Sequence, residues 1–584
     1  MRFNGRPSLL FTLLVFIFCS VATVLIYAPS LNGGFFYDDH RIIFDNLVED
    51  KYDTVNSLFD NFQTRFLAYL SFAASLRLFR FDPFSYHVTN LVLHLCNGWI
   101  LYRLISWLCL SPSLKANDPD KRTFIAAVSS LIFLWHPLQT QAVSYVSQRI
   151  LVLCVFFYLL AILGYLRFRL QGGRWDRVFS LLMCLCAMFT KEIAFTLPVM
   201  LVLIEFYFLN DDARTIKDRL SFLFPFLVTL LIIPLCLFLG LMHGRAIQGV
   251  LNQTVSISRP QYVMTQFNVV VTYIRLLFFP FNQNVDYYYP IVTHFGNMRT
   301  VISLCFIASL LALARLLKKR YILLSFALVW FFVTLSVESS IIVIDDVIQE
   351  YRLYLPMAGF GLFLATFLYG IFRKPASRLV WTGILLISFA GLTFQRNGVW
   401  SSEIRLWEDA WDKSFGKQRI YENLSKAYFR QGDFKKAYDC FYEFTLKDMV
   451  YSRESAQGRL PSDLFGEVAL SLQGHKGIPE ALDISHCILK ENDDARILGD
   501  FGVLLASHNY NNLAYAFFLK SVSQKETDIN SYLNFSKYLA NFNSFHLAKV
   551  VLKTAQSKGL DDRRIHDLLQ DISQLELNYI NNIF

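Results

Sequence analysis

Long apolar segments constrain this sequence more than any other feature. Between residue 8 and about residue 395 the chain consists of apolar blocks separated by short charged loops. Only 17% of its 584 residues are charged, whereas a soluble globular chain carries about 25%. Because the hydrocarbon core of a bilayer offers no water to backbone polar groups, a segment that crosses it must satisfy them internally. The sequence therefore predicts an all-α, polytopic membrane domain.

We expect about 11 transmembrane helices, although several apolar blocks are shorter than the ~20 residues of a straight span. The candidate spans are residues 8–28, 88–108, 123–136, 150–166, 178–190, 193–209, 220–241, 300–316, 321–337, 355–372 and 378–395. The first follows Arg2 and Arg6, and its length favours an uncleaved helix over a signal peptide. Residues 262–280 are interpreted as a re-entrant or interfacial helix, and the alternative that they span stays open.

The basic loops set the expected orientation. With the N-terminus in the cytoplasm, all the short basic loops fall on the cytoplasmic side, as the positive-inside rule requires. These loops are residues 115–122, 167–177, 214–219, 315–320 and 373–378. We therefore attribute the net charge of +9 to topology and expect no nucleic-acid partner. Eleven spans place the C-terminal part outside, with external loops at residues 29–87, 137–149, 191–192, 242–299 and 338–354.

The chain beyond Ser401 reads as a soluble helical domain, so we divide it into residues 1–396 and 397–584. Residues 432–441 resemble the second helix of a tetratricopeptide unit, and residues 423–428 resemble its first helix. Weaker copies of this unit follow, in which Ala481, Leu513 and Ala548 are equivalent to Ala437. The steps between these positions are 44, 32 and 35 residues, and the repeat of that family is about 34 residues. Such repeats stack into an α-solenoid. It would serve as a protein-binding surface or as a rigid cap on the membrane domain.

Two adjacent carboxylates, Asp38 and Asp39, follow the first span. Mutual repulsion and partial desolvation would raise the pKa of one of them. A carboxylate with a raised pKa suits a general base that accepts the proton of an acceptor hydroxyl. The alternative is a solvated loop start in which an aspartate caps a helix.

Histidines and one arginine lie near the ends of two predicted spans: His87 and His94 straddle the start of the second span, and His136 ends the third. His87 and His94 share one helical face with Asn90, and His136 and Gln139 precede Arg149. Polar side chains at this depth of a membrane usually line a cavity, although hydrogen-bonded packing is the alternative. No carboxylate joins these histidines at metal-ligand spacing, and the 10 cysteines form no CxxC pair. We expect no metal site, although the sequence leaves a requirement for a divalent ion open.

Further charges lie in the later external loops. Lys191 and Glu192 separate two apolar blocks, either as a structural ion pair or as partners of an anionic ligand. Asp286 lies in the long loop, and Glu350 precedes Arg352 at the start of the next span. Arginine is the natural bidentate partner of a phosphate. Together these charges suit a lipid-linked phosphosugar, whose phosphate meets the cations while a carboxylate activates the acceptor.

Five motifs carry a resemblance to a known family. They are Tyr37-Asp38-Asp39, the eight residues from His136 to Val143, Lys191-Glu192, Asn284-Val285-Asp286-Tyr287 and the seven residues from Glu350 to Pro356. In this order they resemble bacterial tetratricopeptide membrane proteins related to the animal transmembrane O-mannosyltransferases that target cadherins, within the GT-C glycosyltransferase superfamily. The resemblance implies an external active site and a polyprenyl-phosphate sugar donor. It also implies transfer to a protein hydroxyl, usually with inversion.

The resemblance also implies roles for residues of this chain. The acidic catalytic motif maps onto Asp38 and Asp39, and the donor-phosphate arginine maps onto Arg352. Beside it we expect Lys191 and Arg149 at the phosphate, and the following residues in the substrate pocket: His87, His94, His136, Gln139, Glu192, Asp286 and Glu350. The animal proteins tend to carry His and Glu where this chain has Gln139 and Gln141, so mannose is not assumed.

We therefore expect a protein O-glycosyltransferase of a bacterial inner membrane, with periplasmic repeats that bind the acceptor protein. No cofactor is expected beyond the lipid-linked donor. Two alternatives remain: a ligase or polymerase that moves a whole lipid-linked glycan, and a non-catalytic platform for envelope or secretion assembly. A transporter is disfavoured because no inverted repeat is visible in the sequence.

Overall fold

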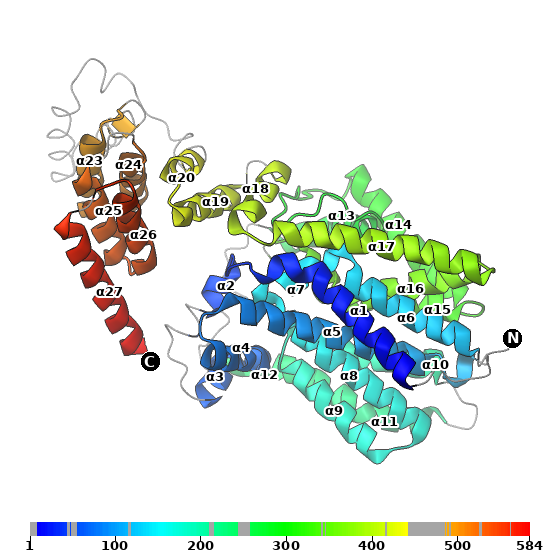
Figure 1. The fold of residues 1–584 in the computed structure, drawn as a ribbon. Helices are drawn as coiled ribbons and strands as arrows, with labels where there is room; N and C mark the ends of the chain where they lie inside the picture. The colour runs from blue at the N-terminus through cyan, green and yellow to red at the C-terminus, as the bar shows by residue number, and fades with distance from the viewer. Residues whose placement is uncertain are drawn as a thin grey trace. The chain divides into compact units, whose positions relative to one another are not determined.

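The computed structural model describes residues 9–43, 47, 55–114, 118–209, 215–242, 257–339, 343–344, 346–414, 417–441, 485, 488–489, 492–524, 528–560 and 562–583. Throughout these residues every regular element is a helix (Figure 1). The predicted all-α class is therefore confirmed for this part of the chain.

The chain divides into two compact units, Met1–Leu406 and Trp407–Phe584. The helix α17 (Pro375–Val399) continues past the junction expected after Arg396. The assignment of separate functions to residues 1–396 and 397–584 stays a prediction.

The first unit contains the α-helices α1 (Leu9–Leu31), α2 (Asp38–His40), α3 (Val55–Phe62), α4 (Phe66–Phe79), α5 (Pro83–Leu108), α6 (Pro119–Trp135), α7 (Thr140–Ser144), α8 (Arg149–Gln171), α9 (Arg174–Met188), α10 (Thr196–Phe208), α11 (Ile216–Val228), α12 (Ile232–Met242), α13 (Arg259–Phe278), α14 (Met298–Leu317), α15 (Ile322–Leu335), α16 (Pro356–Ile371) and α17. Short 3-10 turns connect them: η2 (Gln63–Arg65), η3 (Pro112–Leu114), η4 (Pro137–Gln139), η5 (Val146–Gln148), η6 (Glu192–Phe195), η7 (Thr229–Leu231) and η8 (Glu350–Leu353).

Six helical segments of the described residues are long and apolar enough to cross a membrane. They are Leu14–Leu31, Pro83–Leu108, Val146–Gln171, Ile216–Leu239, Met298–Leu317 and Pro375–Val399. A seventh span results if α6 and the segment Pro137–Ser144, which bend by 53°, are counted as one. The apolar helices α15 and α16 are shorter, and α13 is not in this set. The chain is an integral membrane protein. The count of 11 spans and the re-entrant interpretation of residues 262–280 stay predictions.

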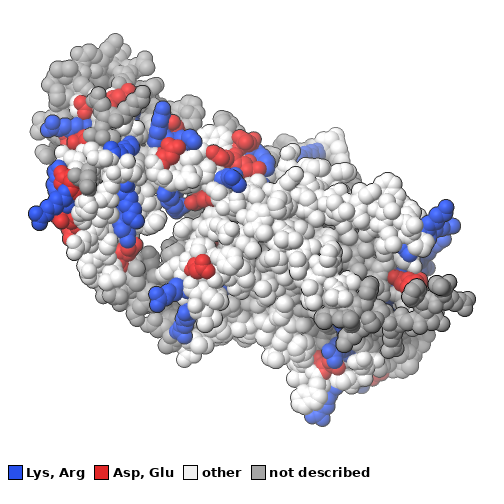
Figure 2. Space-filling view, viewed as in Figure 1, with Lys and Arg blue, Asp and Glu red and all other residues white. Residues whose placement is uncertain are grey.

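The first unit has an inner and an outer set of helices. The span that contains α8 is 72% buried, whereas those of α1, α14 and α17 are 17–22% buried. The inner helices α5, α6, α8 and α16 pack against one another, and α1 lies beside α17 (Figure 1). Figure 2 shows, on the visible face, a broad surface of uncharged described residues with charged side chains gathered at its margins. That pattern suits an outer set of helices that contacts lipid.

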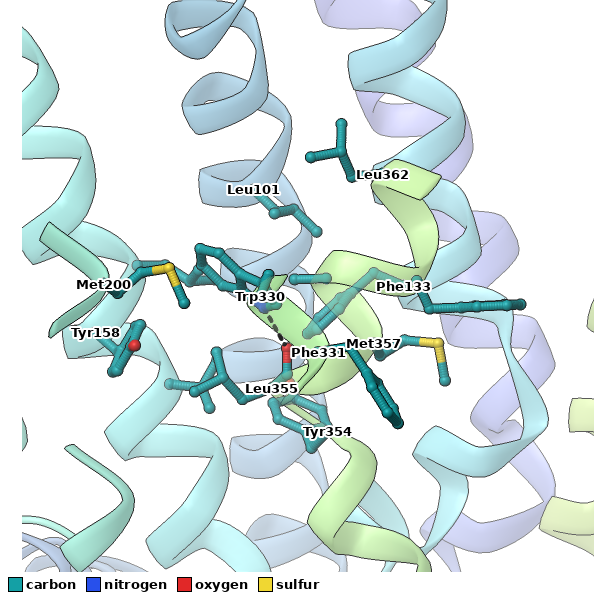
Figure 3. Close-up of a cluster of buried hydrophobic side chains, with 14 of the residues drawn as sticks. Leu101, Phe133, Tyr158, Met200, Trp330, Phe331, Tyr354, Leu355, Met357 and Leu362 are labelled. Carbon is teal, nitrogen blue, oxygen red and sulfur yellow. Dashed lines mark hydrogen bonds between the residues drawn. The ribbon is translucent and has the colours of Figure 1, made fainter. Parts of the chain in front are cut away.

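Glycine allows the closest approach between inner helices. A Cβ atom at Gly359 would lie 2.7 Å from the ring of Trp330 on α15, and one at Gly361 would lie 2.8 Å from the carbonyl oxygen of Ser129 on α6. Small residues let membrane helices pack backbone to backbone in this way. The Trp330 indole N–H donates to the Leu355 carbonyl at 3.0 Å, within the buried cluster drawn in Figure 3. This packing fixes the start of α16 directly beyond η8.

The second unit consists of antiparallel helix pairs. Its helices are α18 (Glu403–Lys413), which begins in the first unit, α19 (Gln418–Gln431), α20 (Phe434–Phe441), α23 (Ala495–Ser507), α24 (Asn511–Ser523), α25 (Ile529–Asn541), α26 (Phe545–Ser557) and α27 (Arg563–Ile583). Ser425 and Ser536 each donate a hydroxyl hydrogen bond to a carbonyl 12 residues later, at Ala437 and Ala548. These two expected repeat positions are therefore equivalent in structure. Ala481 lies outside the described residues, and the tetratricopeptide type stays a prediction.

One turn motif recurs between these helices. Each turn has a residue of positive φ, at Gly432, Asn509, Asn543 and Gly559. The next backbone N–H donates to the carbonyl five residues before it, in the pairs Asp433–Tyr428, Tyr510–Leu505, Ser544–Leu539 and Leu560–Ala555. This is the Schellman arrangement, in which a left-handed residue ends a helix and satisfies its last carbonyls. Asparagine takes the place of glycine at two of the four turns because it tolerates the left-handed region.

Candidate functional site

Asp38 and Asp39 lie in different environments although they are adjacent. The Asp39 side chain is buried, and its two oxygens accept hydrogen bonds from the backbone N–H groups of Phe36 at 3.0 Å and Ser147 at 2.6 Å. Burial raises the pKa of Asp39 to about 7, although these hydrogen bonds act to lower it. The Asp38 carboxylate is 36% exposed and lies 3.4 Å from the Arg41 guanidinium. Asp39 therefore fixes the loop, and Asp38 is the accessible carboxylate.

The backbone around Asp38 is held by aromatic residues. Tyr37 has a φ of 54°, in the left-handed region that a bulky side chain seldom adopts. The Asp38 backbone N–H donates to the Tyr145 hydroxyl at 2.9 Å, and Tyr145 packs against Trp400 with 5.7 Å between ring centroids. Strained backbone of this kind persists only where its surroundings enforce it, and it often accompanies function.

His87 lies beside this loop. Its side chain is buried, and neither ring nitrogen has a hydrogen-bond partner of normal geometry within the described residues, although the backbone of Gly33 and Gly34 lies close to the ring. A Cβ atom at Gly33 would lie 3.4 Å from His87 Nε2 and 2.9 Å from the Trp400 carbonyl oxygen. Glycine thus lets the end of α1 pass closely between α5 and the end of α17. The substrate-pocket role expected for His87 stays a prediction.

Arg149 is already saturated by hydrogen bonds. It is fully buried, and its three guanidinium nitrogens donate to Asn90 Oδ1 at 2.9 Å, Ser75 Oγ at 2.7 Å and the Tyr86 carbonyl at 3.2 Å. The guanidinium also lies over the Phe72 ring at 4.6 Å. A phosphate would have to replace these bonds. The phosphate role expected for Arg149 stays a prediction, and its observed role is to join α4, α5 and α8.

The other two histidines make internal hydrogen bonds. His94 Nδ1 lies 2.8 Å from the Tyr354 hydroxyl, and its Nε2 lies 3.2 Å from the Leu134 carbonyl oxygen. His136 Nε2 lies 3.0 Å from the Leu277 carbonyl oxygen, and its Nδ1 accepts a backbone N–H two residues later. Both are buried. This is the hydrogen-bonded packing that the sequence left open, and their pocket role stays a prediction.

Two glutamines occupy the turn between α6 and α8. Gln139 is buried, and neither amide atom has a partner in the described residues. Gln141 donates to the Gln349 side chain at 2.9 Å and accepts the Tyr351 backbone N–H at 2.8 Å. Gln141 therefore attaches α7 to η8. Gln139 has amide donors and an acceptor available for a ligand.

Lys191 and Glu192 form ion pairs with distant residues rather than with each other. Lys191 Nζ lies 2.9 Å from Glu338 Oε1. Glu192 accepts from Arg65 at 2.9 and 3.2 Å, and from the Thr64 hydroxyl at 3.2 Å. Burial raises the pKa of Glu192, but Arg65 outweighs this effect and holds that pKa at about 2. The two pairs join the start of α4 and the end of α15 to the start of η6.

Arg352 is a buried cation on η8. It donates to the backbone carbonyls of Val347 at 3.2 Å and Asp346 at 2.6 Å, and its Nε–H has no partner in the described part of the chain. The neighbouring Tyr351 ring lies 5.1 Å from Lys191 Nζ. Two cations expected at the donor phosphate, Lys191 and Arg352, thus flank one aromatic side chain.

Glu350 fixes the loop between α13 and α14 at residues 283–287. One carboxylate oxygen accepts the Asn284 backbone N–H at 2.6 Å and the Tyr287 hydroxyl at 2.5 Å, and the other accepts the Gln283 amide at 2.9 Å. Asp286 is also buried in this loop, where its backbone N–H donates to Asn284 Oδ1 at 3.1 Å. With these hydrogen bonds, Glu350 is a structural clamp beside Arg352.

The structure thus forms three groups of expected site residues. Asp38 and Asp39 lie at Tyr145 and η5, and His87 lies beside Gly33, just before them in the chain. Lys191 and Arg352 lie next to Tyr351, and the third group consists of Glu350 and Asp286. The segment from η4 to η5 connects them, because α7 packs against η8 and α2 packs against η5. Asp38 and Arg352 make no direct contact in the described residues, and their location in one pocket stays a prediction.

Sequence reasoning missed several residues that organise these groups. Tyr145 and Ser147 hold the carboxylate loop, and Glu338 pairs with Lys191. Only Glu338 had a signal, since it is a lone charge at the end of an apolar block. Within the described residues no three His, Cys, Asp or Glu side chains lie together as metal ligands. Whether a metal is required stays open.

No protein-family model matches this sequence. The chain is 24% identical over 510 residues to Protein O-mannosyl-transferase Tmtc3 of Drosophila melanogaster. The aligned region covers 73% of this chain and 54% of the relative. It is 23% identical over 472 residues to Protein O-mannosyl-transferase F38B6.6 of Caenorhabditis elegans, with 77% and 64% covered. A shorter match, 30% identical over 192 residues, is to Protein O-mannosyl-transferase Tmtc1 of Drosophila melanogaster.

The chain spans 49–64% of the length of the curated relatives that match most of it. The relatives named here are animal proteins, so the bacterial origin expected from the sequence stays a prediction. Over about three quarters of its length, the chain is homologous to the animal membrane proteins named protein O-mannosyl-transferases.

Proposed function

We propose that this chain is a GT-C-type membrane glycosyltransferase. It moves a sugar from a polyprenyl-phosphate donor to a protein hydroxyl on the external face of the membrane. The observation that carries the proposal is the arrangement of Asp38 and Asp39 in a chain homologous to protein O-mannosyl-transferases. One carboxylate is accessible, and the other is buried and positions the loop. This division of roles is what a positioned general base requires.

In the proposed reaction Asp38 accepts the proton of the acceptor hydroxyl. The hydroxyl oxygen then forms a bond to the anomeric carbon of the sugar as the bond between that carbon and the phosphate oxygen breaks. The polyprenyl phosphate leaves with the electron pair, and its negative charge is stabilised by Lys191 and Arg352. Fixed cations stabilise such developing charge better than water because they need no reorganisation during the reaction. Attack from the face opposite the phosphate gives inversion.

The unit beyond Leu406 supports acceptor binding in this proposal. Its antiparallel helix pairs and recurring turns are consistent with a tetratricopeptide solenoid, which offers an extended surface to a protein segment. The same unit would also serve the alternative of a non-catalytic assembly platform. The glycan ligase alternative differs in the mass transferred, because it moves a preassembled chain.

The substitution Asp38→Asn tests the proposal. The purified chain is incubated with a polyprenyl-phosphate sugar and an acceptor protein, and intact-mass spectrometry measures the added mass. We expect one sugar with the wild-type chain and none with Asp38→Asn, while insertion and thermal unfolding stay unchanged. Asp120→Asn is the matched control, because Asp120 is an exposed carboxylate at the start of α6. Equal transfer by the wild type and Asp38→Asn would overturn the assignment of the base.

A further inference from the structure

Glu338 is the least firmly held carboxylate among the buried charges around Lys191. One oxygen pairs with Lys191 Nζ at 2.9 Å, and the two side chains are only 10% and 11% exposed. The other oxygen, Oε2, is buried and has no hydrogen-bond partner within the described residues. Glu192, in contrast, has both oxygens bound by Arg65 and one also by Thr64.

Further unpaired polar atoms surround Glu338. Gln266 on α13 and Arg352 on η8 both donate to the Val347 carbonyl, at 2.8 and 3.2 Å, so their side chains are neighbours. Gln266 Oε1 and Arg352 Nε lack partners in the described residues. One helical turn before Gln266, the Tyr262 hydroxyl donates to the Glu338 backbone carbonyl at 3.0 Å. Unpaired donors and acceptors are rare in buried protein, and their concentration in one place indicates a ligand-binding site.

The charges favour exchange of one anion for another. Arg65, Lys191 and Arg352 are balanced by the carboxylates of Glu192, Glu338 and the nearby Asp346. An incoming phosphate would add uncompensated negative charge unless one carboxylate moved away. An uncompensated buried charge is strongly destabilising. Glu338 has fewer bonds to lose than Glu192, so its displacement costs less than that of Glu192.

We propose that Glu338 is a resident anion that occupies Lys191 in the empty site and is displaced by the phosphate group of a polyprenyl phosphate ester. The proposal rests on the proposed function, because it assigns this site to the phosphate of the donor or of the released carrier lipid. In the occupied site the phosphate oxygens accept from Lys191 and from the Arg352 Nε–H. After transfer, the return of Glu338 to Lys191 favours release of the polyprenyl phosphate.

The test measures binding of farnesyl phosphate to the full-length protein in detergent, with farnesol as the uncharged control. The substitution Glu338→Gln keeps the size of the side chain and removes the competing charge. We expect Glu338→Gln to bind farnesyl phosphate at least threefold more tightly than the wild type, and farnesol binding to stay unchanged. Lys191→Met is expected to weaken binding at least threefold.

Glu192→Gln is the matched control, because it removes a neighbouring charge that we do not expect to move. Tighter binding of farnesyl phosphate by Glu338→Gln, but not by Glu192→Gln, supports the displacement of Glu338 by the phosphate. The proposal would be overturned if both variants bound farnesyl phosphate equally more tightly than the wild type, or if Glu338→Gln bound it no more tightly than the wild type. It would also be overturned if no variant showed binding that depends on the phosphate. Should Glu338→Gln fail to fold, Glu338→Asp decides in its place. It keeps the charge but is too short to reach Lys191, and it is expected to tighten binding to a smaller extent.

This binding assay contains no sugar and no acceptor, so its outcome is independent of transferase activity. If no sugar transfer is observed but Glu338→Gln still binds farnesyl phosphate more tightly, the chain has an anion-binding site and another activity. Transfer that depends on Asp38, without any Glu338 effect, would refute the displacement alone.

Discussion

The hydrogen bonds of Asp39 predict that this residue controls the stability of the carboxylate loop rather than the chemistry directly. The substitution Asp39→Asn replaces one of two acceptor oxygens by an amide N–H₂ group. That group then faces the backbone N–H of either Phe36 or Ser147, which loses its partner. A buried donor left without an acceptor costs about 1–3 kcal/mol. In Asp39→Ala both N–H groups lose their acceptor, so the loss is expected to be about twice as large.

Hydrogen exchange measures this effect locally. Since 1.4 kcal/mol corresponds to about a tenfold change in an equilibrium constant, Asp39→Asn should speed exchange of the amide that loses its acceptor, Phe36 or Ser147, by roughly 5- to 150-fold. Peptides that cover residues 33–40 and 140–150 report it by mass spectrometry. Asp38→Asn is the control and should leave this exchange unchanged, because Asp38 bonds Tyr145 through its backbone N–H and not through its carboxylate. Unchanged exchange in Asp39→Asn would refute the argument that Asp39 holds η5.

The remaining predictions concern pH and packing. The pKa of Asp39 is about 7 in the folded chain and near 4 in the unfolded chain, so the folded chain binds more protons between pH 4 and pH 7. The free energy of unfolding should therefore fall by up to about 4 kcal/mol as the pH rises through this range. Thermal unfolding from pH 4 to 8 measures this slope, which should shrink in Asp39→Asn. Glu205→Gln leaves the buried Arg169 guanidinium without its counter-charge and should cost about 3–5 kcal/mol in detergent unfolding. Gly432→Ala places a Cβ atom 3.0 Å from Thr554 Oγ1 at a φ of 81° and should destabilise the C-terminal unit by about 1–2 kcal/mol, seen as faster proteolysis.

Segments of long apolar sequence were the most predictable part of the fold. The block at residues 8–28 corresponds to α1, and that at residues 378–395 lies inside α17. Short blocks were less predictable, because the sequence does not show where a helix bends. The block at residues 123–136 ends at the His136-Pro137 break, where a second helical segment follows at 53°. Proline lacks the N–H that would continue the helix, but the angle depends on tertiary packing.

The partners of the charged residues could not be predicted from the sequence. Adjacency suggested repulsion between Asp38 and Asp39, whereas burial is the largest cause of the raised pKa of Asp39. One of the two backbone N–H groups that hold its carboxylate lies more than 100 positions away, at Ser147. Likewise, Lys191 and Glu192 were expected either to pair together or to meet a ligand. Each instead has its own distant partner, for Lys191 the carboxylate of Glu338. Residue type indicated which side chains need partners, and only the packing of α4, η6 and α15 identified them.

The central claim is that an accessible Asp38 carboxylate activates a protein hydroxyl for sugar transfer. The most direct measurement compares wild-type and Asp38→Asn chains at equal protein levels in membranes, with intact-mass spectrometry of an acceptor protein and of its hydroxyl-blocked variant. The account predicts one added sugar mass with the wild-type chain, and none with Asp38→Asn or with the blocked acceptor. An unchanged acceptor mass with the wild-type chain, or equal modification by the two chains, would contradict it.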